Sequence, residues 1–66
     1  MKNNVRELRL QKGWSQTELA AKTAVSRQSI HAIETGKYVP TTVLALKLAR
    51  VLDCVVEALF TLEEGD

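Results

Sequence analysis

The chain of 66 residues has little cysteine, proline, glycine or aromatic character. Its single cysteine, Cys54, excludes an intramolecular disulfide, so we expect a protein of the reducing cytoplasm and a thiol that is buried rather than reactive. No apolar run approaches the roughly 18 residues of a membrane helix, and the first residues lack the apolar stretch of a signal peptide. The sequence therefore predicts a cytoplasmic protein without a membrane partner.

The residues of common catalytic and metal sites are also scarce. His31 is the only histidine, and no second histidine or carboxylate pair accompanies it or Cys54 at metal-ligand spacing. The chain has no glycine-rich phosphate loop, no pair of carboxylates for acid–base work and no nucleophile with a base beside it. We therefore expect neither an enzyme nor a metal or cofactor, and a chain this short leaves no room for a small-molecule sensor domain.

The charge is distributed unevenly. The net charge is only +1, but residues 1–50 carry all nine basic side chains against three acids, a balance of +6. Residues 51–66 carry five acids and no base, a balance of −5. Such a division favours a basic part that faces phosphates and an acidic part that nucleic acid repels.

The composition, 45% hydrophobic and 26% charged, is typical of a folded domain. Without repeats or linkers, residues 1–66 form one unit. A core of this size rarely supplies more than about 3–5 kcal/mol of stability, so self-association is expected.

Capping residues predict five helices. Asn3 or Asn4 can cap a helix over residues 4–12 that stops at Gly13, and Ser15 with Glu18 has the spacing of a capping box for residues 16–23. The remaining helices are expected over residues 27–35 after Ser26 and up to Gly36, from Thr41 or Thr42 to Asp53, and over residues 56–60. Residues 61–63 form either a strand paired with residues 1–3 or a frayed end.

Helices 16–23 and 27–35, joined by a tight turn, have the organisation of a helix-turn-helix. On the second of them Ile30 and Ile33 point to one side, and the opposite side carries short polar or small side chains: Gln28, His31, Ala32 and Thr35. A polar, nearly uncharged face suits a helix that lies in the major groove, where Gln and Arg can bridge base edges. An ordinary solvated surface would look the same on a helical wheel.

Several motifs decide between these interpretations. The segments 14–20, 25–30, 33–37, 40–41 and 46–49 read WSQTELA, VSRQSI, IETGK, PT and LKLA. In order and spacing they resemble the phage-repressor helix-turn-helix family, also called Cro-like or XRE-type, over residues 5–60. The resemblance implies an all-α, compact five-helix, lambda-repressor-like DNA-binding domain, similar to the small stand-alone dimeric repressors of that family.

The resemblance also implies a set of DNA contacts. Gln16 matches a position that grips a phosphate; Ser26, Arg27, Gln28 and Ala32 match positions that read bases. Thr35, Lys37 and Tyr38 match the loop that clamps downstream phosphates. Ser29 and His31 complete the expected set, His31 as a solvated or phosphate-facing residue. Ala32 departs from the longer polar side chain often found there, so methyl contact replaces a hydrogen bond.

Other conspicuous residues have structural interpretations. The family pattern pairs Arg9 with Glu34, and we predict this salt bridge because Glu34 lies at the edge of an apolar face. Trp14 precedes the Ser15 cap, where packing against the core is favoured over base stacking. Asp53 is expected to cap the fifth helix or the turn before it.

A single helix-turn-helix reads too few base pairs for useful specificity, which favours a homodimer. We place the dimer interface on apolar residues of the C-terminal segment: Leu52, Val55, Val56, Leu59, Phe60 and Leu62. The sequence thus predicts a cytoplasmic repressor that binds a palindromic double-stranded operator through its major groove.

Two alternatives stay open. One is an antitoxin or phage-control protein that also binds a protein partner, through its acidic C-terminus. The other is a protein-interaction module that kept the fold and lost DNA binding. Gln16, Arg27, Gln28 and Lys37 argue against the latter because an acidic or bulky apolar face would be expected there.

Overall fold

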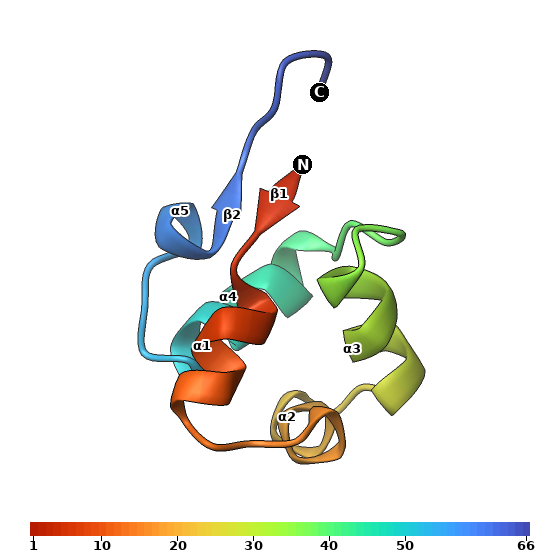
Figure 1. The fold of residues 1–66 in the computed structure, drawn as a ribbon, viewed down its shortest axis with the longest axis vertical. Coiled ribbons are helices and arrows are strands. Elements are labelled where there is room, and N and C mark those ends of the chain that lie inside the picture. The colour runs from red at the N-terminus through yellow and green to blue at the C-terminus, as the bar shows by residue number, and fades with distance from the viewer.

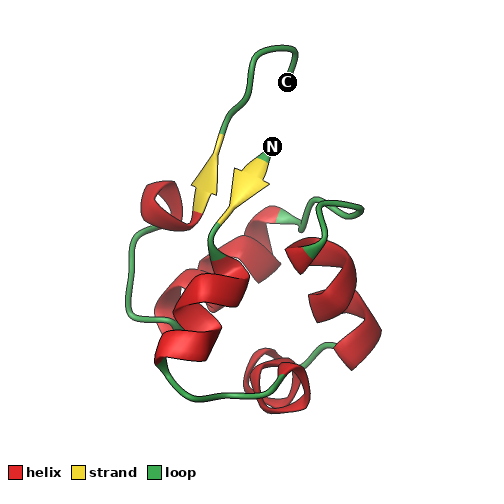
Figure 2. Cartoon of the chain, in the orientation of Figure 1, coloured by secondary structure: helices red, strands yellow, loops and turns green.

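A computed structural model describes all residues, 1–66, as five short helices and one two-stranded sheet (Figures 1 and 2). The elements are β1 (Lys2–Asn3), α1 (Val5–Gln11), α2 (Gln16–Thr23), α3 (Arg27–Glu34), α4 (Thr42–Val51), α5 (Val56–Leu59) and β2 (Phe60–Thr61). All five predicted helices are present, with ends within two residues of expectation; α4 stops at Val51 rather than at Asp53. The predicted all-α fold with a small terminal sheet is confirmed.

Hydroxyl caps start three of the helices. The Ser15 hydroxyl accepts the Glu18 amide at 3.0 Å, and the Glu18 carboxylate accepts the Ser15 amide at 3.0 Å, which completes the predicted capping box. Ser26 and Thr41 each accept the amide three residues further on, at 3.1 and 3.3 Å. These bonds satisfy amides that have no partner within their own helix, so each helix begins at a defined residue.

Residues with a left-handed backbone conformation follow α1, α2 and α4. Gly13 (φ +75°) follows α1 as expected, and Ala24 (φ +59°) and Asp53 (φ +56°) play the same part after α2 and α4. A side chain with a Cβ is strained in this region, so surrounding contacts must hold the two non-glycine residues there. Beyond Asp53, the Cys54 amide donates to the Ala49 carbonyl at 2.9 Å, which closes the end of α4.

The start of α1 differs from expectation because two asparagines serve tertiary contacts. Asn4 makes no cap; its side-chain amide donates to the Ala58 carbonyl at 3.0 Å. Asn3 accepts the Val5 amide at 3.2 Å and donates to the Ile33 carbonyl at 2.9 Å. Together they bind the start of α1 to α5 and to the end of α3.

The two ends of the chain lie side by side (Figure 1). Strands β1 and β2 pair antiparallel, with Lys2 opposite Thr61 and Asn3 opposite Phe60. The strand interpretation of the C-terminal segment is therefore right, but the strand covers residues 60–61, and residues 62–66 continue beyond it.

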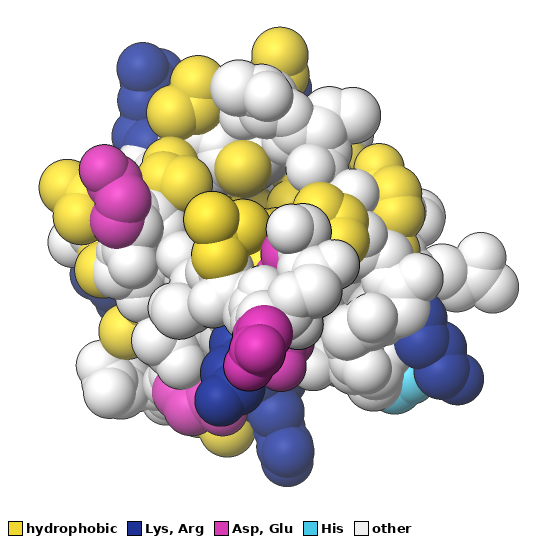
Figure 3. Space-filling view, turned by 90° about the horizontal axis from the view of Figure 1, so that it is seen from above, with side chains coloured by type: hydrophobic (Ala, Val, Ile, Leu, Met, Phe, Trp, Pro, Cys, Tyr) yellow, Lys and Arg dark blue, Asp and Glu magenta, His cyan; other side chains and the backbone are white.

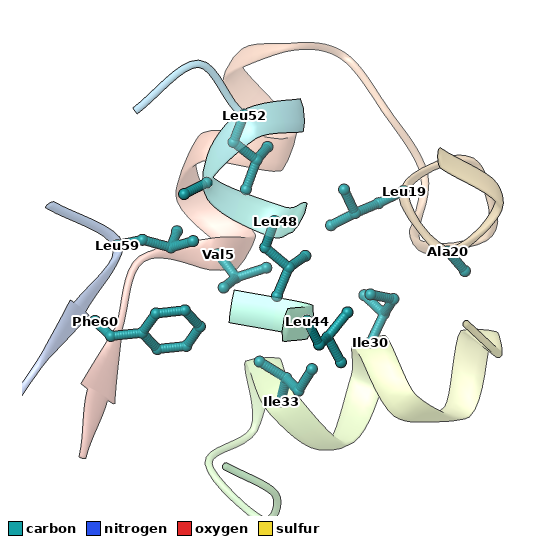
Figure 4. Packing of buried hydrophobic residues seen from close by; sticks show 11 residues of the cluster. Val5, Leu19, Ala20, Ile30, Ile33, Leu44, Leu48, Leu52, Leu59 and Phe60 are labelled. Atoms are coloured by element: carbon teal, nitrogen blue, oxygen red, sulfur yellow. The ribbon is translucent and has the colours of Figure 1, made fainter. Parts of the chain in front are cut away.

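The core contains eleven buried hydrophobic residues contributed by every helix and by β2. Figure 4 shows Leu44 and Leu48 of α4 in its middle, with Val5 and Leu59 to one side and Leu19 to the other. Helix α4 thus supports the α2–α3 pair from behind. No helix has both the length and the apolar character needed to cross a membrane.

Candidate nucleic-acid interface

Helix α3 is placed with one face inward and the other outward. Ile30 and Ile33 are fully buried against the core. The outward side chains of Arg27, Gln28 and His31 are exposed and line a shallow hollow that contains no hydrophobic residue. The face predicted from the helical wheel is therefore an exposed polar surface.

A chain of hydrogen bonds joins α1, α2 and α3 beside this face. Arg9 and Glu34 form the predicted ion pair, with Nε donating to Oε2 at 2.7 Å and Nη2 to Oε1 at 3.1 Å. Gln16 Nε2 lies 3.2 Å from Glu34 Oε1 and 3.3 Å from His31 Nδ1. Side-chain hydrogen bonds, as well as packing, thus fix the start of α2 to the outward face of α3.

The ion pair is almost completely covered. The side chains of Arg9 and Glu34 are 9% and 3% exposed, and Arg9 also donates to the Trp14 carbonyl at 2.8 Å. Hydrogen bonding to Glu34 raises the pKa of Arg9, although burial opposes the charge. Since every buried side-chain nitrogen and oxygen atom of the protein has a partner, no uncompensated charge remains in this region.

Arg6 of α1 joins the candidate site, although the sequence analysis did not include it. It is exposed and lines a second polar hollow with Gln16, Arg27, His31 and Thr35. The spacing in the sequence could have indicated Arg6, because it precedes Arg9 by three residues and both side chains therefore lie on one face of α1. Arg6 therefore extends the polar face of α3 across to α1.

The predicted phosphate-clamping loop follows α3. Lys37 and Tyr38 are exposed, and their amides donate to the Ala32 carbonyl at 2.9 and 3.2 Å. The Thr35 hydroxyl donates to the His31 carbonyl at 2.9 Å. This hydroxyl would have to rotate before it could donate to a phosphate, and the predicted Thr35 contact stays a prediction.

The remaining predicted contacts have a structural use in the free protein. The Ser26 and Ser29 hydroxyl oxygens lie 3.0 Å apart within the α3 cap, and Ser29 is half-buried. The Ala32 side chain is half-buried as well. Of the outward groups of α3, Arg27 and Gln28 make no side-chain hydrogen bond, whereas His31 lies within 3.3 Å of Gln16 Nε2.

Trp14 and Asp53 make contacts that the sequence analysis missed. Trp14 packs against the core as expected, and Lys22 Nζ lies 4.6 Å from the centre of its ring. Asp53 does not cap α5, whose first position is preceded by Val55; its carboxylate accepts Lys12 Nζ at 2.6 Å. The capping interpretation of Asp53 is therefore wrong, because its carboxylate forms an ion pair with Lys12 instead.

The C-terminal segment divides into core and surface. Leu52, Leu59 and Phe60, assigned to a dimer interface from the sequence, are 3%, 0% and 9% exposed within a single chain. Leu52 and Leu59 are therefore core residues of the single chain, which corrects their assignment to the interface, whereas Phe60 also lines a surface hollow with Leu46 and Val56. Val55 and Leu62 of the predicted set are 64% and 78% exposed, and Val56 is half-buried.

Helix α4 adds apolar surface that the sequence analysis did not assign. Val43 and Leu46 are 64% and 56% exposed. Leu46 lines a hollow between α4 and α5 together with Arg50, Cys54, Val55 and other residues. Burial, and to a lesser degree the nearby Asp53, raises the pKa of the Cys54 thiol, so it stays protonated at neutral pH.

The acidic tail folds back onto the first residue. The Met1 ammonium lies 3.1 Å from Glu63 Oε1 and 3.2 Å from Asp66 Oδ2. Hydrogen bonds to Glu63 and then Asp66 raise the pKa of the ammonium group. Figure 3 looks onto this end of the molecule and shows hydrophobic side chains gathered there with acidic groups among them.

Comparison with known proteins places the chain among DNA-binding regulators. A family model described as helix-turn-helix matches residues 5–58, from the first residue of α1 into α5. An uncharacterized HTH-type transcriptional regulator of Bacillus subtilis is 47% identical over 64 residues, 97% of this chain and 97% of that protein. Another, from Methanocaldococcus jannaschii, is 41% identical over 66 residues, 100% of each chain.

Solved structures share the architecture. The restriction-modification controller protein C.AhdI from Aeromonas hydrophila matches with a TM-score of 0.80 and 38% identity, over 86% of each chain. The N-terminal DNA binding domain of SinR from Bacillus subtilis matches with a TM-score of 0.80 and 30% identity, over 96% of this chain and 91% of that one.

Proposed function

Because the chain belongs to the XRE-type helix-turn-helix family of transcriptional regulators, we propose that it is a sequence-specific repressor that binds a palindromic operator as a homodimer in the cytoplasm. The outward face of α3 carries this proposal. Arg27, Gln28 and His31 are exposed together there, and no acidic side chain lines the hollow that they form. Groups of this kind can bridge guanine and adenine edges in the major groove.

The surroundings of α3 suit a phosphate backbone. Arg6 lines a hollow with Arg27 and His31, and Lys37 follows the end of α3; both are exposed and provide charge without reading sequence. The N-terminus of α2 adds the positive end of a helix dipole next to Gln16. The arrangement therefore supports base contacts by α3 and phosphate contacts by the flanking elements.

Dimerisation is supported by the exposed apolar groups of α4 and α5. Val43, Leu46 and Val55 are each more than half exposed, whereas the interior of this small protein holds only eleven hydrophobic side chains. A two-fold pair would cover them and present two α3 helices about one turn of DNA apart. Such a pair would repress transcription by occluding a promoter.

The test is selection of bound sites from a random DNA pool, followed by titration of the selected duplex. Gln28→Ala should cost about 1–3 kcal/mol on that duplex and relax the preference at one position. Lys37→Ala is the matched control. It should weaken binding to all duplexes alike and reduce the slope of log affinity against log salt concentration by about one. Equal binding of every duplex, unaffected by Gln28→Ala, would reject sequence recognition by α3.

A further inference from the structure

The orientation of one amide is determined by the buried ion pair. The Glu34 carboxylate can only accept hydrogen bonds, and Gln16 presents a side-chain atom 3.2 Å from its Oε1. That atom must be the NH₂ group, because an amide oxygen there would face a carboxylate oxygen. Arg9 holds the carboxylate through two bonds, so the acceptor cannot turn away.

The same amide then determines the state of the histidine. Gln16 Nε2 also lies 3.3 Å from His31 Nδ1. An NH₂ group has two protons, and with one directed to Glu34 the other is available for the imidazole. Nδ1 must therefore accept, and a neutral imidazole whose Nδ1 accepts carries its proton on Nε2.

We propose that the chain Arg9–Glu34–Gln16 holds His31 as the Nε2–H tautomer, so that α3 presents one outward donor at this position to an acceptor on DNA. His31 is exposed and lines the polar hollows on both sides of it, one with Gln28 and one with Arg6. This assignment rests on the proposed DNA-binding function. The acceptor is either a phosphate oxygen or a base acceptor in the major groove, namely N7 of guanine or adenine, O6 of guanine or O4 of thymine.

The buried Arg9–Glu34 pair thus orients His31 in addition to joining α1 to α3. A donor on His31 cannot bond to the amino groups of cytosine and adenine, because these are donors themselves. With a fixed tautomer, His31 therefore positions the protein if it contacts a phosphate and determines specificity if it contacts a base. Both protons of the Gln16 side-chain amide are then directed to Glu34 and His31. The effect of this side chain on DNA passes through the imidazole, and a direct phosphate contact of Gln16 would have to use its backbone amide at the start of α2.

The tautomer is measured on the free protein. Nitrogen-15 NMR of the neutral imidazole, recorded at about pH 8.5, should show Nδ1 unprotonated and Nε2 protonated. In Gln16→Ala the Nδ1–H form should become detectable, whereas the control Gln28→Ala should leave the wild-type pattern. A wild-type protein that populates the Nδ1–H form, or a Gln16→Ala variant with an unchanged pattern, would overturn the assignment.

The contact with DNA is measured on the selected duplex. His31→Ala should weaken binding about fivefold, the usual effect of one hydrogen bond. His31→Gln should recover most of this loss because its amide reaches the Nε2 position, whereas the shorter His31→Asn should not. Unchanged affinity of His31→Ala would overturn the contact and leave the proposed function standing. A wild-type protein that binds no selected duplex would overturn both.

Modified duplexes distinguish the two acceptors. If His31 contacts a base, replacement of one base by an analogue that lacks the acceptor should abolish the difference between wild type and His31→Ala: 7-deazaguanine or 7-deazaadenine for N7, 2-aminopurine for guanine O6, or 5-methyl-2-pyrimidinone for thymine O4. If it contacts the backbone, a methylphosphonate at one phosphate should do so instead. A difference that persists with every substitution would show that no acceptor on DNA meets this donor.

Discussion

The α2–α3 side and the α4–α5 side of the molecule expose different chemistry. On the first, Arg27, Gln28 and His31 are outward polar groups, and a hydrogen-bonded chain from the buried Arg9–Glu34 pair reaches His31 through Gln16. On the second, Val43 and Leu46 are 64% and 56% exposed. Polar groups held in place suit base edges and phosphates, and exposed apolar groups suit a protein surface. A chain of net charge +1 thus exposes a polar surface on one side and an apolar surface on the other.

The largest effect is expected from removal of the ion pair behind the α2–α3 side. Glu34→Ala leaves the Arg9 guanidinium buried without its partner, which should reduce the free energy of unfolding by about 3–5 kcal/mol. Circular dichroism during heating measures the loss. Glu7→Ala, at an exposed acid on α1, is the control and should change the melting temperature little. An unchanged melting temperature in Glu34→Ala would contradict the structural importance of the pair.

A charge placed on the α4–α5 side should break the proposed dimer and leave the fold intact. Leu46→Glu should weaken self-association by about 1.5–3 kcal/mol because an apolar side chain is lost from the interface. Sedimentation equilibrium, with and without the operator duplex, provides the measurement. Leu10→Glu, at an α1 leucine that is 55% exposed, is the matched control. A wild-type protein that sediments only as a 7.3 kDa species would remove the dimer.

Helix caps on the two sides provide a direct comparison of smaller effects. Ser15→Ala at the start of α2 and Thr41→Ala at the start of α4 should each cost about 1 kcal/mol in urea unfolding. Ser15→Ala should cost more, because Ser15 belongs to a reciprocal capping box and Thr41 makes a single bond. A larger loss in Thr41→Ala would show that α4, rather than α2, depends on its cap.

The smallest effect is expected in the pH dependence of α2. A hydrogen bond from the Ser15 backbone amide lowers the pKa of the Glu18 carboxylate from its ordinary value of 4.5, and the Ser15 side chain lowers this pKa further. A group whose pKa is lower in the folded state stabilises the protein fully above the unfolded value and loses that contribution as pH falls through the folded value. Glu18→Gln should therefore flatten the acid side of a plot of urea midpoint against pH. A curve that keeps its wild-type slope below about pH 4.5 would contradict this role.

The sequence by itself determined the local structure. Ser15, Ser26 and Thr41 act on amides three residues away, and Gly13 acts on the helix just before it, so adjacent residues suffice to locate helix starts and ends. The polar face of α3 follows equally from a period of 3.6 residues. The Arg9–Glu34 pair was also predictable, but from the family pattern rather than from spacing.

Only the tertiary structure decided the contacts between distant residues. The pairing of Lys12 with Asp53, the addition of Arg6 to the polar face and the approach of Gln16 to His31 depend on how the helices pack. The division of C-terminal apolar residues into core (Leu52, Leu59 and Phe60) and surface (Val55 and Leu62) has the same origin. Hydrophobicity indicates that a side chain prefers to leave water, and only the packed structure determines whether its own chain covers it.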